Sequence, residues 1–292
     1  MARHKHPRPT GKYDRRPPAR SEEAAGERGA GDRPRRPERK GGGGPREDGH
    51  WLYGRHAVLA AIANPFRELR QIWLTREAQA RFGAELAQAI AGRPGGTAQP
   101  QLVDRGDIEA VLGNAVHQGI AAFAAPLPDR DLSEVLPAED QDATVLVLDQ
   151  VTDPHNVGAI LRSAEAFGAA AVVVTERHAP EETGTLAKAA SGAIERVPLI
   201  RVVNLARELD YLKSRGFWIL GLAGEATQNL NQAKPGGRIA LVLGAEGEGL
   251  RRLTREHCDL LVRLPMAGAM PSLNVSNAAA VALYELNREK LR

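Results

Sequence analysis

Two polar side chains stand out in a loop that follows an apolar, strand-like run. The loop reads DQVTDPHNVGAILR over 149–162, and a helix is predicted after its Asp153-Pro154 turn, with Asn156 as the N-cap. Arg162 lies about 140° from the apolar stripe of that helix, so it points away from the core. A guanidinium stays protonated and donates hydrogen bonds, which suits it to stabilising negative charge. The plain alternative is a helix cap followed by a solvated arginine.

A second loop is rich in glycine and in acidic residues. The segment 241–250, LVLGAEGEGL, is a predicted strand that runs into a turn with Glu246 and Glu248. Glycines let a backbone approach a ligand closely. The turn lacks the Gly-Lys-Ser/Thr of a P-loop and the GxGxxG spacing of a dinucleotide site, and its carboxylates disfavour phosphate. Two interpretations of the glycines remain, namely a close backbone contact to a ligand or a plain tight turn.

A third loop crowds polar residues at the start of the last helix. In LPMAGAMPSLNVSNAAA (264–280), a predicted strand ends at Pro265, and Ser272, Asn274 and Ser276 follow. Capping uses one of these side chains, so three exceed what a helix start needs. All three loops follow predicted strands, and open α/β sheets bind ligands beyond the carboxyl ends of their strands. The loops are therefore candidates for a binding site at that edge.

The elements that must position these loops alternate between strand and helix. The first strand of the C-terminal part, TVLVLD (144–149), is almost wholly apolar, as expected for a strand buried on both faces of a parallel sheet. Further strands are predicted at 170–175, 197–202, 217–224, 238–246 and 259–265. Helices are predicted at 156–168, 184–191, 205–216, 250–257 and 274–291. The alternation predicts a mostly parallel α/β sheet over 144–292.

A smaller α/β domain is predicted in front of this sheet, over 49–126. Order is expected to begin near 51–64, where Val58, Leu59 and Ile62 follow helical spacing. Strands are then predicted at 70–75, 101–104 and 119–126, and helices at 81–92 and 105–113. A linker rich in proline and acidic residues, 127–143, separates the two domains.

The first 48 residues differ from the rest of the chain in composition. They contain 14 Lys/Arg against 8 Asp/Glu and no Leu, Ile, Val, Phe or Trp. Such a segment buries too little apolar surface to offset its ordering entropy, so a disordered basic tail is predicted at 1–48. A basic tail suits a polyanionic partner such as RNA, and a solubilising leader is the alternative.

Composition also bears on where the protein works. Cys258 is the only cysteine, so neither an internal disulfide nor a cysteine-rich metal site is expected. The start of the chain has charge but no apolar run of a secretory signal, and no stretch of about 18 apolar residues occurs. These features predict a cytoplasmic protein without a metal site or a membrane span.

The three loops, in this order, resemble motifs 1, 2 and 3 of the SpoU/TrmH family of RNA ribose methyltransferases. The run from Asp149 to Arg162 matches motif 1, and LGAEGEG at 243–249 matches motif 2. Motif 3 matches LPM at 264–266 and SLNVS at 272–276. The front domain also resembles the family's substrate-binding domain through YGRHAVLAAI (53–62) and HQGIAAF (117–123). The resemblance covers 50–292.

The resemblance implies a fold, a cofactor and residue roles that spacing alone does not show. It implies a deep trefoil knot in the C-terminal sheet, S-adenosylmethionine bound in the knot, and a homodimer. By position, the cofactor would contact Gly244, Leu264, Met266 and Leu273. Arg162 would act on the ribose 2′-hydroxyl of RNA. The residues that would orient the arginine, the nucleotide and the cofactor are Asn156, Glu246, Ser272 and Asn274.

Within the family, the two-domain layout and the run GAEGEGLRRLTREHCD most resemble enzymes that methylate a guanosine of large-subunit ribosomal RNA. The alternative in the same class is a tRNA ribose methyltransferase. A non-catalytic RNA-binding ribosome-assembly protein and a nucleotide-dependent oxidoreductase are alternatives from other classes. Arg55 and His56 are candidate RNA contacts in the front domain, and Met270-Pro271 is a candidate determinant of substrate fit.

Overall fold

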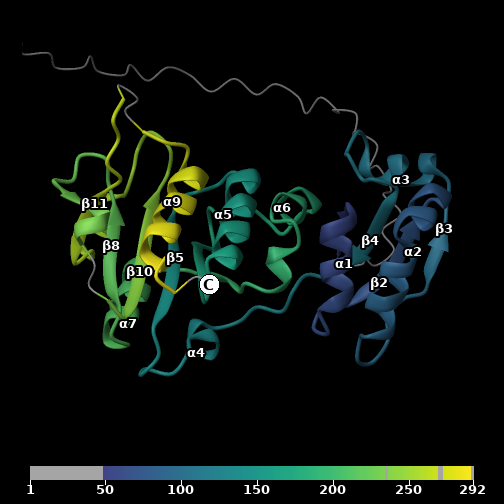
Figure 1. The fold of residues 1–292 in the computed structure, drawn as a ribbon, viewed down its shortest axis with the longest axis horizontal. Coiled ribbons are helices and arrows are strands. Elements are labelled where there is room, and N and C mark those ends of the chain that lie inside the picture. The colour runs from purple at the N-terminus through teal and green to yellow at the C-terminus, as the bar shows by residue number, and fades with distance from the viewer. Residues whose placement is uncertain (1–48, 234–235, 269–271, 291–292) are drawn as a thin grey trace, which may run out of the picture. The chain divides into compact units, whose positions relative to one another are not determined.

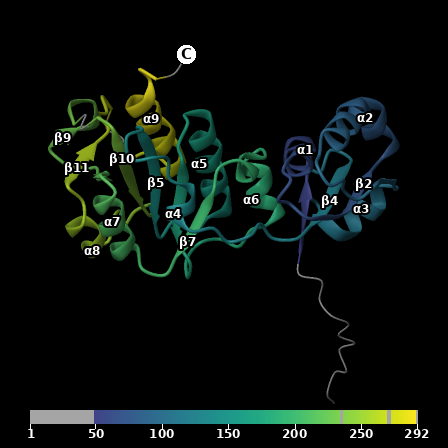
Figure 2. The ribbon, with the colours of Figure 1, turned by 90° about the horizontal axis from the view of Figure 1, so that it is seen from below.

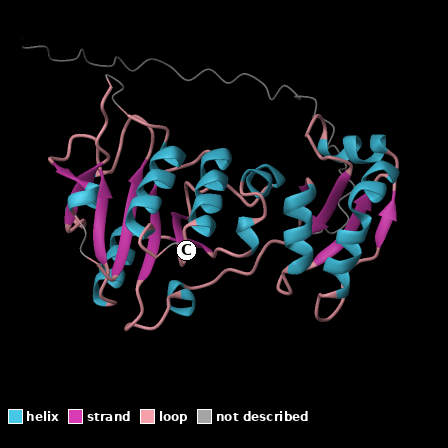
Figure 3. Ribbon diagram, viewed as in Figure 1, coloured by secondary structure: helices cyan, strands magenta, loops and turns pink. Residues whose placement is uncertain are grey.

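The structure is a computed structural model that describes residues 49–233, 236–268 and 272–290. The tail predicted at 1–48 and the Met270-Pro271 pair lie outside these residues. Figure 1 labels the helices and strands, and Figure 3 distinguishes helices, strands and loops by colour.

Seven parallel strands form the sheet of the C-terminal part. In spatial order they are β7 (Leu199–Val202), β6 (Ala171–Thr175), β5 (Ala143–Asp149), β10 (Arg238–Gly244), β8 (Trp218–Leu222), β11 (Leu260–Arg263) and β9 (Gln228–Asn229). Every residue of β5 is buried, as its apolar sequence predicts for a central strand. The predicted parallel α/β fold is confirmed, and the two-residue strand β9 is an addition to it.

Helices cover both faces of this sheet. One face packs against α5 (Pro154–Ala166), α6 (Gly184–Ala189) and α9 (Val275–Asn287), with the short helices η1 (Ala193–Glu195) and η2 (Leu230–Gln232) beside them. The other face packs against α4 (Leu132–Val135) and α7 (Leu205–Ser214). The short helix α8 (Arg252–Glu256) precedes β11. Strand side chains alternate between the two apolar cores, so Leu146 and Leu148 face one set of helices and Val145 and Val147 the other.

Helices α5 and α9 lie side by side, although more than 100 residues separate them in the sequence (Figures 1 and 2). The Phe167 ring, at the end of α5, lies 5.9 Å from the Tyr284 ring of α9 in an edge-on contact. The Thr144 hydroxyl at the start of β5 donates to Asn287 Oδ1 at 3.1 Å. The last helix is therefore fixed to the first strand and first helix of the sheet, which places its N-terminus near the loop after β5.

The front domain is a four-stranded sheet with three helices. Its elements are β1 (His50–Tyr53), α1 (Arg55–Ala63), β2 (Leu69–Leu74), α2 (Arg76–Ala91), β3 (Pro100–Leu102), α3 (Arg105–Leu112) and β4 (Ile120–Ala124), and the strand order is β1-β4-β2-β3. The helical spacing of Val58, Leu59 and Ile62 is confirmed by α1, whereas the edge strand β1 before it was not predicted. Gly54 has φ 87°, which ends an edge strand and turns the chain into α1.

The segment predicted as a linker, 127–143, contains the one-turn helix α4. Asp131 caps this helix by accepting a hydrogen bond from Ser133 N at 2.8 Å. Leu132 is buried against the sheet, so this part of the segment is packed onto the C-terminal domain.

Candidate active site

The loop after β5 starts helix α5 earlier than the sequence predicts. Asp153 is the N-cap, since its Oδ1 accepts from His155 N at 3.0 Å, and Pro154 occupies the first turn. The prediction that Asn156 caps this helix is therefore wrong. Asn156 lies inside the first turn, and its side-chain amide donates to Glu246 Oε1 at 3.2 Å. The displaced cap leaves the Asn156 side chain available for contacts between loops.

The last helix begins at a residue that serves two purposes. Asn274 caps α9 through its Oδ1, which accepts from Ser276 N at 2.9 Å and from Ser276 Oγ at 2.6 Å. Its Nδ2 donates to Asn156 Oδ1 at 3.1 Å and to Glu246 Oε1 at 2.5 Å. Glu246 Oε1 also accepts from Val275 N at 3.3 Å. One side chain from each of the three predicted loops therefore meets the other two.

The glycine-rich turn after β10 closes on itself. A Cβ on Gly244 would lie 2.1 Å from the carbonyl carbon of Gly249, so no other residue fits there without opening the turn. Gly249 N donates to Ala245 O at 3.0 Å, and Gly247 and Gly249 have φ of 84° and 68°. Turn geometry thus accounts for these glycines. The same geometry sets where Glu246 projects.

A buried carboxylate that the sequence did not single out ties the first loop to the second. Asp149, the last residue of β5, is fully buried, and its Oδ2 accepts from Arg251 N at 3.0 Å. Its Oδ1 accepts from Arg251 Nε at 2.6 Å. The available signal was a lone acidic residue at the end of an apolar strand, because a buried carboxylate requires donors. Asp149 therefore holds the end of the 244–251 turn against the end of β5.

A cavity of about 680 Å³ opens beside this junction. Among the residues that line it are seven predicted from the sequence, namely Gly244, Glu246, Leu264, Met266, Ser272, Leu273 and Asn274. The Met266 and Leu273 side chains are 41% and 40% exposed, which leaves apolar surface open to a ligand. A volume of this order suits a ligand of nucleoside size. The four residues predicted to contact the cofactor thus share one cavity wall, and their contacts to it stay predictions.

Arg162 lies apart from these residues. It is exposed on α5, six residues after Asn156, which places it about 9 Å further along the helix axis. It does not line the cavity, and no hydrogen bond or ion pair of its side chain occurs among the residues that the structure describes. Within one chain the structure brings together Asn156, Glu246 and Asn274, and it places Ser272 at the cavity without such a contact.

Other site types receive no support from the described part of the chain. There, no three His, Cys, Asp or Glu side chains are grouped so as to hold a metal ion. Nor does any helix of that part combine the length and apolar character needed to cross a bilayer.

Comparison with known proteins identifies the family. Residues 143–284 match the model of the SpoU rRNA methylase family, and residues 51–130 match the model for RNA 2′-O ribose methyltransferase substrate binding. The chain belongs to the SpoU rRNA methylase family. This confirms the family that the three loop motifs indicated, and the substrate-binding match confirms the nature of the front domain.

Proteins similar in sequence to this chain include two that are named 23S rRNA (guanosine-2′-O-)-methyltransferase RlmB. The protein of Pseudomonas putida is 44% identical over 244 residues, which cover 82% of this chain and 96% of that protein. The protein of Escherichia coli K12 is 43% identical over 242 residues, which cover 82% and 98%.

Solved structures share the SpoU fold. The methyltransferase AviRb from Streptomyces viridochromogenes, crystallised in complex with AdoMet, aligns with a TM-score of 0.70 at 24% identity over 84% of this chain and 91% of that one, which supports the fold alone. An RNA 2′-O ribose methyltransferase aligns with a TM-score of 0.66 at 27% identity over 83% and 89%.

Proposed function

We propose that the protein transfers a methyl group from S-adenosylmethionine to the ribose 2′-hydroxyl of a guanosine in 23S ribosomal RNA. The observation that carries this proposal is the contact of Asn156 with Glu246 and Asn274, two residues that line one cavity, in a SpoU-family chain. Relatives at 43–44% identity over almost their whole length carry that activity in their names. This supports the same reaction and the same class of RNA.

The cavity fits the cofactor. When bound, S-adenosylmethionine supplies a methyl group that is already activated for transfer. The tight turn at Gly244 brings backbone to the cavity wall, and Leu264 and Leu273 lie on neighbouring parts of the wall. Met266 and Leu273 offer exposed apolar surface to a purine ring. These residues would hold the cofactor mostly through backbone and apolar contacts.

The protein's part in an in-line transfer is to position the groups and to stabilise charge that develops on the attacking oxygen. We assign charge stabilisation to Arg162, because a guanidinium donates several hydrogen bonds and stays protonated. The hydrogen bonds among Asn156, Glu246 and Asn274 fix the three loops around the nucleotide. Ser272 lies on the cavity wall, where we assign it to binding the nucleotide or cofactor.

We further propose that the protein works as a homodimer and that Arg162 reaches the site of the partner copy. Arg162 is exposed on α5. The neighbouring helix α9 presents Val281 and Tyr284, which are 49% and 52% exposed. Apolar side chains next to an unpaired arginine are typical of an interface. Sedimentation should report a dimer for the wild type and a monomer for Tyr284→Glu, and a wild-type monomer would refute this part of the proposal.

We assign RNA recognition to the domain at 49–126 and methyl transfer to 144–292. On α1, His56 is exposed and Arg55 is partly exposed. Arg55 pairs with Glu85 at 2.8 Å, so an RNA phosphate would compete with Glu85 for the Arg55 guanidinium. The trefoil knot of the family remains a prediction for the C-terminal sheet. Ribosomal RNA as substrate supports a cytoplasmic location.

The test is transfer of tritiated methyl groups from S-adenosylmethionine to purified ribosomal RNA and tRNA pools, followed by mapping of the modified ribose. The proposal expects label at one guanosine of 23S RNA, whereas label in tRNA alone would favour the tRNA alternative. Label in neither pool would favour a non-catalytic RNA-binding protein.

A variant tests the role of Arg162. Arg162→Ala should bind S-adenosylmethionine normally, because the residue does not line the cavity, and should lose at least about a hundredfold in turnover, the scale of one lost charge-stabilising donor. Turnover near that of the wild type would refute the assignment.

A further inference from the structure

The front domain contacts a short segment of the C-terminal domain, 182–195, which contains α6 and η1. We call it the docking segment. Two of its glycines touch front-domain backbone. A Cβ on Gly184 would lie 2.3 Å from Trp51 O, and a Cβ on Gly192, whose φ is 87°, would lie 2.9 Å from His56 O. Only glycine at these positions allows the two domains to approach so closely.

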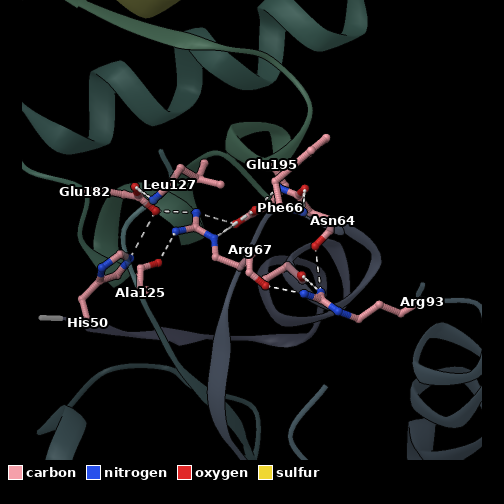
Figure 4. Close-up of polar contacts among 10 residues, drawn as sticks. His50, Asn64, Phe66, Arg67, Arg93, Ala125, Leu127, Glu182 and Glu195 are labelled. Carbon is pink, nitrogen blue, oxygen red and sulfur yellow. Dashed lines mark hydrogen bonds and ion pairs between the residues drawn. The ribbon is translucent and has the colours of Figure 1, made fainter. Parts of the chain in front are cut away.

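A buried arginine fixes the same junction. Arg67, from the turn between α1 and β2, is fully buried, and its Nη2 contacts Glu195 Oε1 at 2.7 Å (Figure 4). Nη2 also pairs with Glu182, and Nη1 donates to Ala125 O at 2.9 Å. Asn64 Nδ2 adds a hydrogen bond to Glu195 Oε2 at 2.8 Å. The guanidinium thus links two carboxylates of the docking segment to two parts of the front domain, the turn that carries Arg67 and the backbone at Ala125.

The partners of Arg67 are themselves held in place. Glu182 also accepts from Leu127 N at 3.1 Å and lies 3.3 Å from His50 Nε2. Burial alone would raise the pKa of Glu182, but the hydrogen bonds from His50 and Arg67 and the charge of Arg67 lower it to about 2. Arg93 donates to the carbonyl oxygens of the turn that carries Arg67, at 2.8 Å for Asn64 O (Figure 4). The cluster is therefore charged and ordered on both sides of the junction.

The docking segment also packs closely on the helix that carries two predicted catalytic residues. A Cβ on Gly158 of α5 would lie 2.6 Å from Ala189 Cβ and 2.7 Å from Leu186 O, both in α6. Gly158 lies two residues after Asn156 and four before Arg162. This close packing fixes the docking segment to the C-terminal domain, so it serves as a rigid platform for the front domain.

Burying an ion pair costs desolvation free energy, and apolar residues of similar volume often stabilise a fold equally well or better. What the pairing adds is direction, because a planar guanidinium between two carboxylates accepts one geometry. We propose that Arg67 is a positioning residue that holds the RNA-binding domain in one orientation on the docking segment, so that bound RNA is presented to the methyl-transfer site. This inference rests on the proposed function.

The first experiment separates binding of RNA from turnover in the full chain. In Arg67→Met, and independently in Gly184→Ala, the KM for ribosomal RNA should rise at least about tenfold, which corresponds to about 1.4 kcal/mol. The kcat at saturating RNA and the Kd for S-adenosylmethionine should stay within about threefold of the wild type, since neither residue lines the cofactor cavity.

Two further variants serve as controls. Arg67→Lys should restore part of the KM, because an ammonium keeps the charge but lacks the planar fork. Gly106→Ala in α3 should match the wild type, since a Cβ there meets no atom within 4 Å.

The second experiment measures orientation without relying on activity. Spin labels at Val111→Cys in α3 and Val203→Cys after β7, in a Cys258→Ala background diluted with unlabelled chain, report the distance between the domains. Both side chains are exposed. A narrow distance distribution is expected with Arg67 present and a broad one in Arg67→Met.

The two readouts distinguish the inference from the proposed function. A chain that transfers no methyl group but shows a distribution that broadens in Arg67→Met would refute the proposed function and retain the orienting role. Wild-type KM in both variants, together with a wild-type distribution in Arg67→Met, would overturn the inference. So would a fall in kcat at unchanged KM, because that result assigns Arg67 to local stability alone.

Discussion

The contact between Asp149 and Arg251 gives a quantitative prediction for the site. Asp149→Asn keeps the size of the side chain and one carbonyl oxygen but removes the charge that accepts from Arg251 N at 3.0 Å and Arg251 Nε at 2.6 Å. Because the carboxylate is fully buried, the substitution weakens two charge-assisted hydrogen bonds at the point where the 244–251 turn meets β5.

The magnitude follows from the burial of each partner. Breaking a fully buried ion pair costs about 3–5 kcal/mol. Arg251 is 44% exposed, so solvent screens its charge, and we expect a cost of about 1.5–3 kcal/mol. For a chain of this size each kcal/mol lowers Tm by about 2–4 °C, which gives a fall of about 3–12 °C. The freed turn should also weaken binding of S-adenosylmethionine about tenfold, or about 1.4 kcal/mol.

Thermal unfolding followed by circular dichroism and titration calorimetry with S-adenosylmethionine measure these two effects. The matched control is Arg252→Ala, which removes an exposed ion pair with Glu256 on the neighbouring helix α8. Exposed pairs contribute about 0–1 kcal/mol, so that variant should behave as the wild type does. If Asp149→Asn melted within about 1 °C of the wild type and bound the cofactor equally well, Asp149 would not hold the turn.

Three further predictions concern single residues. Gly244→Ala should lower Tm and weaken cofactor binding in calorimetry, because its Cβ would lie 2.1 Å from the Gly249 carbonyl carbon. The pKa of Glu182 lies at about 2, below its ordinary 4.5, so its stabilising contribution is present above about pH 4.5 and is lost as the pH falls toward 2. Thermal unfolding between pH 3 and 7 should show a smaller loss on acidification in Glu182→Gln. Burial raises the pKa of Cys258 to about 11, so the native protein should react slowly with a thiol reagent at about pH 8, and rapid reaction would contradict this.

Most of the C-terminal fold could be predicted because its strands are apolar on both faces. Ala143–Asp149 and Arg238–Gly244 are buried almost throughout. A short, continuously apolar segment of this kind is typical of a central strand in a parallel sheet. The order of the strands could not be predicted, since β10 inserts between β5 and β8, and the periodicity of one strand carries no information about its neighbours. Strand β9 was missed because two residues, Gln228 and Asn229, make no pattern.

The N-terminal edge strand was missed and the helix cap of α5 was mispredicted, both for local reasons. WLYGRHAVLAAIAN reads as one helical stretch unless Gly54 is taken as a break, and its φ of 87° shows that it is one. Asn156 and Asp153 are both good N-caps by type. Proline favours the first position of a helix, so Pro154 already indicated a start at Asp153. With the cap placed at Asp153, the sequence would have predicted that the Asn156 side chain is not used for capping and is available for a functional contact.

Asn274 shows that one polar residue at the start of a helix can both cap the helix and belong to the site. Its Oδ1 caps α9 while its Nδ2 contacts Asn156 Oδ1 and Glu246 Oε1, so a single amide does both. Excess over the needs of a cap was therefore a sound reason to suspect a site, although the capping residue itself belongs to that site. Sequence spacing can identify such candidates, but only the strand order that places β5 next to β10 brings their loops within hydrogen-bonding distance. The residue types in the loops indicate which chemistry is possible. The parallel sheet and the tight turn at Gly244 bring those residues together, and without that arrangement no site would form.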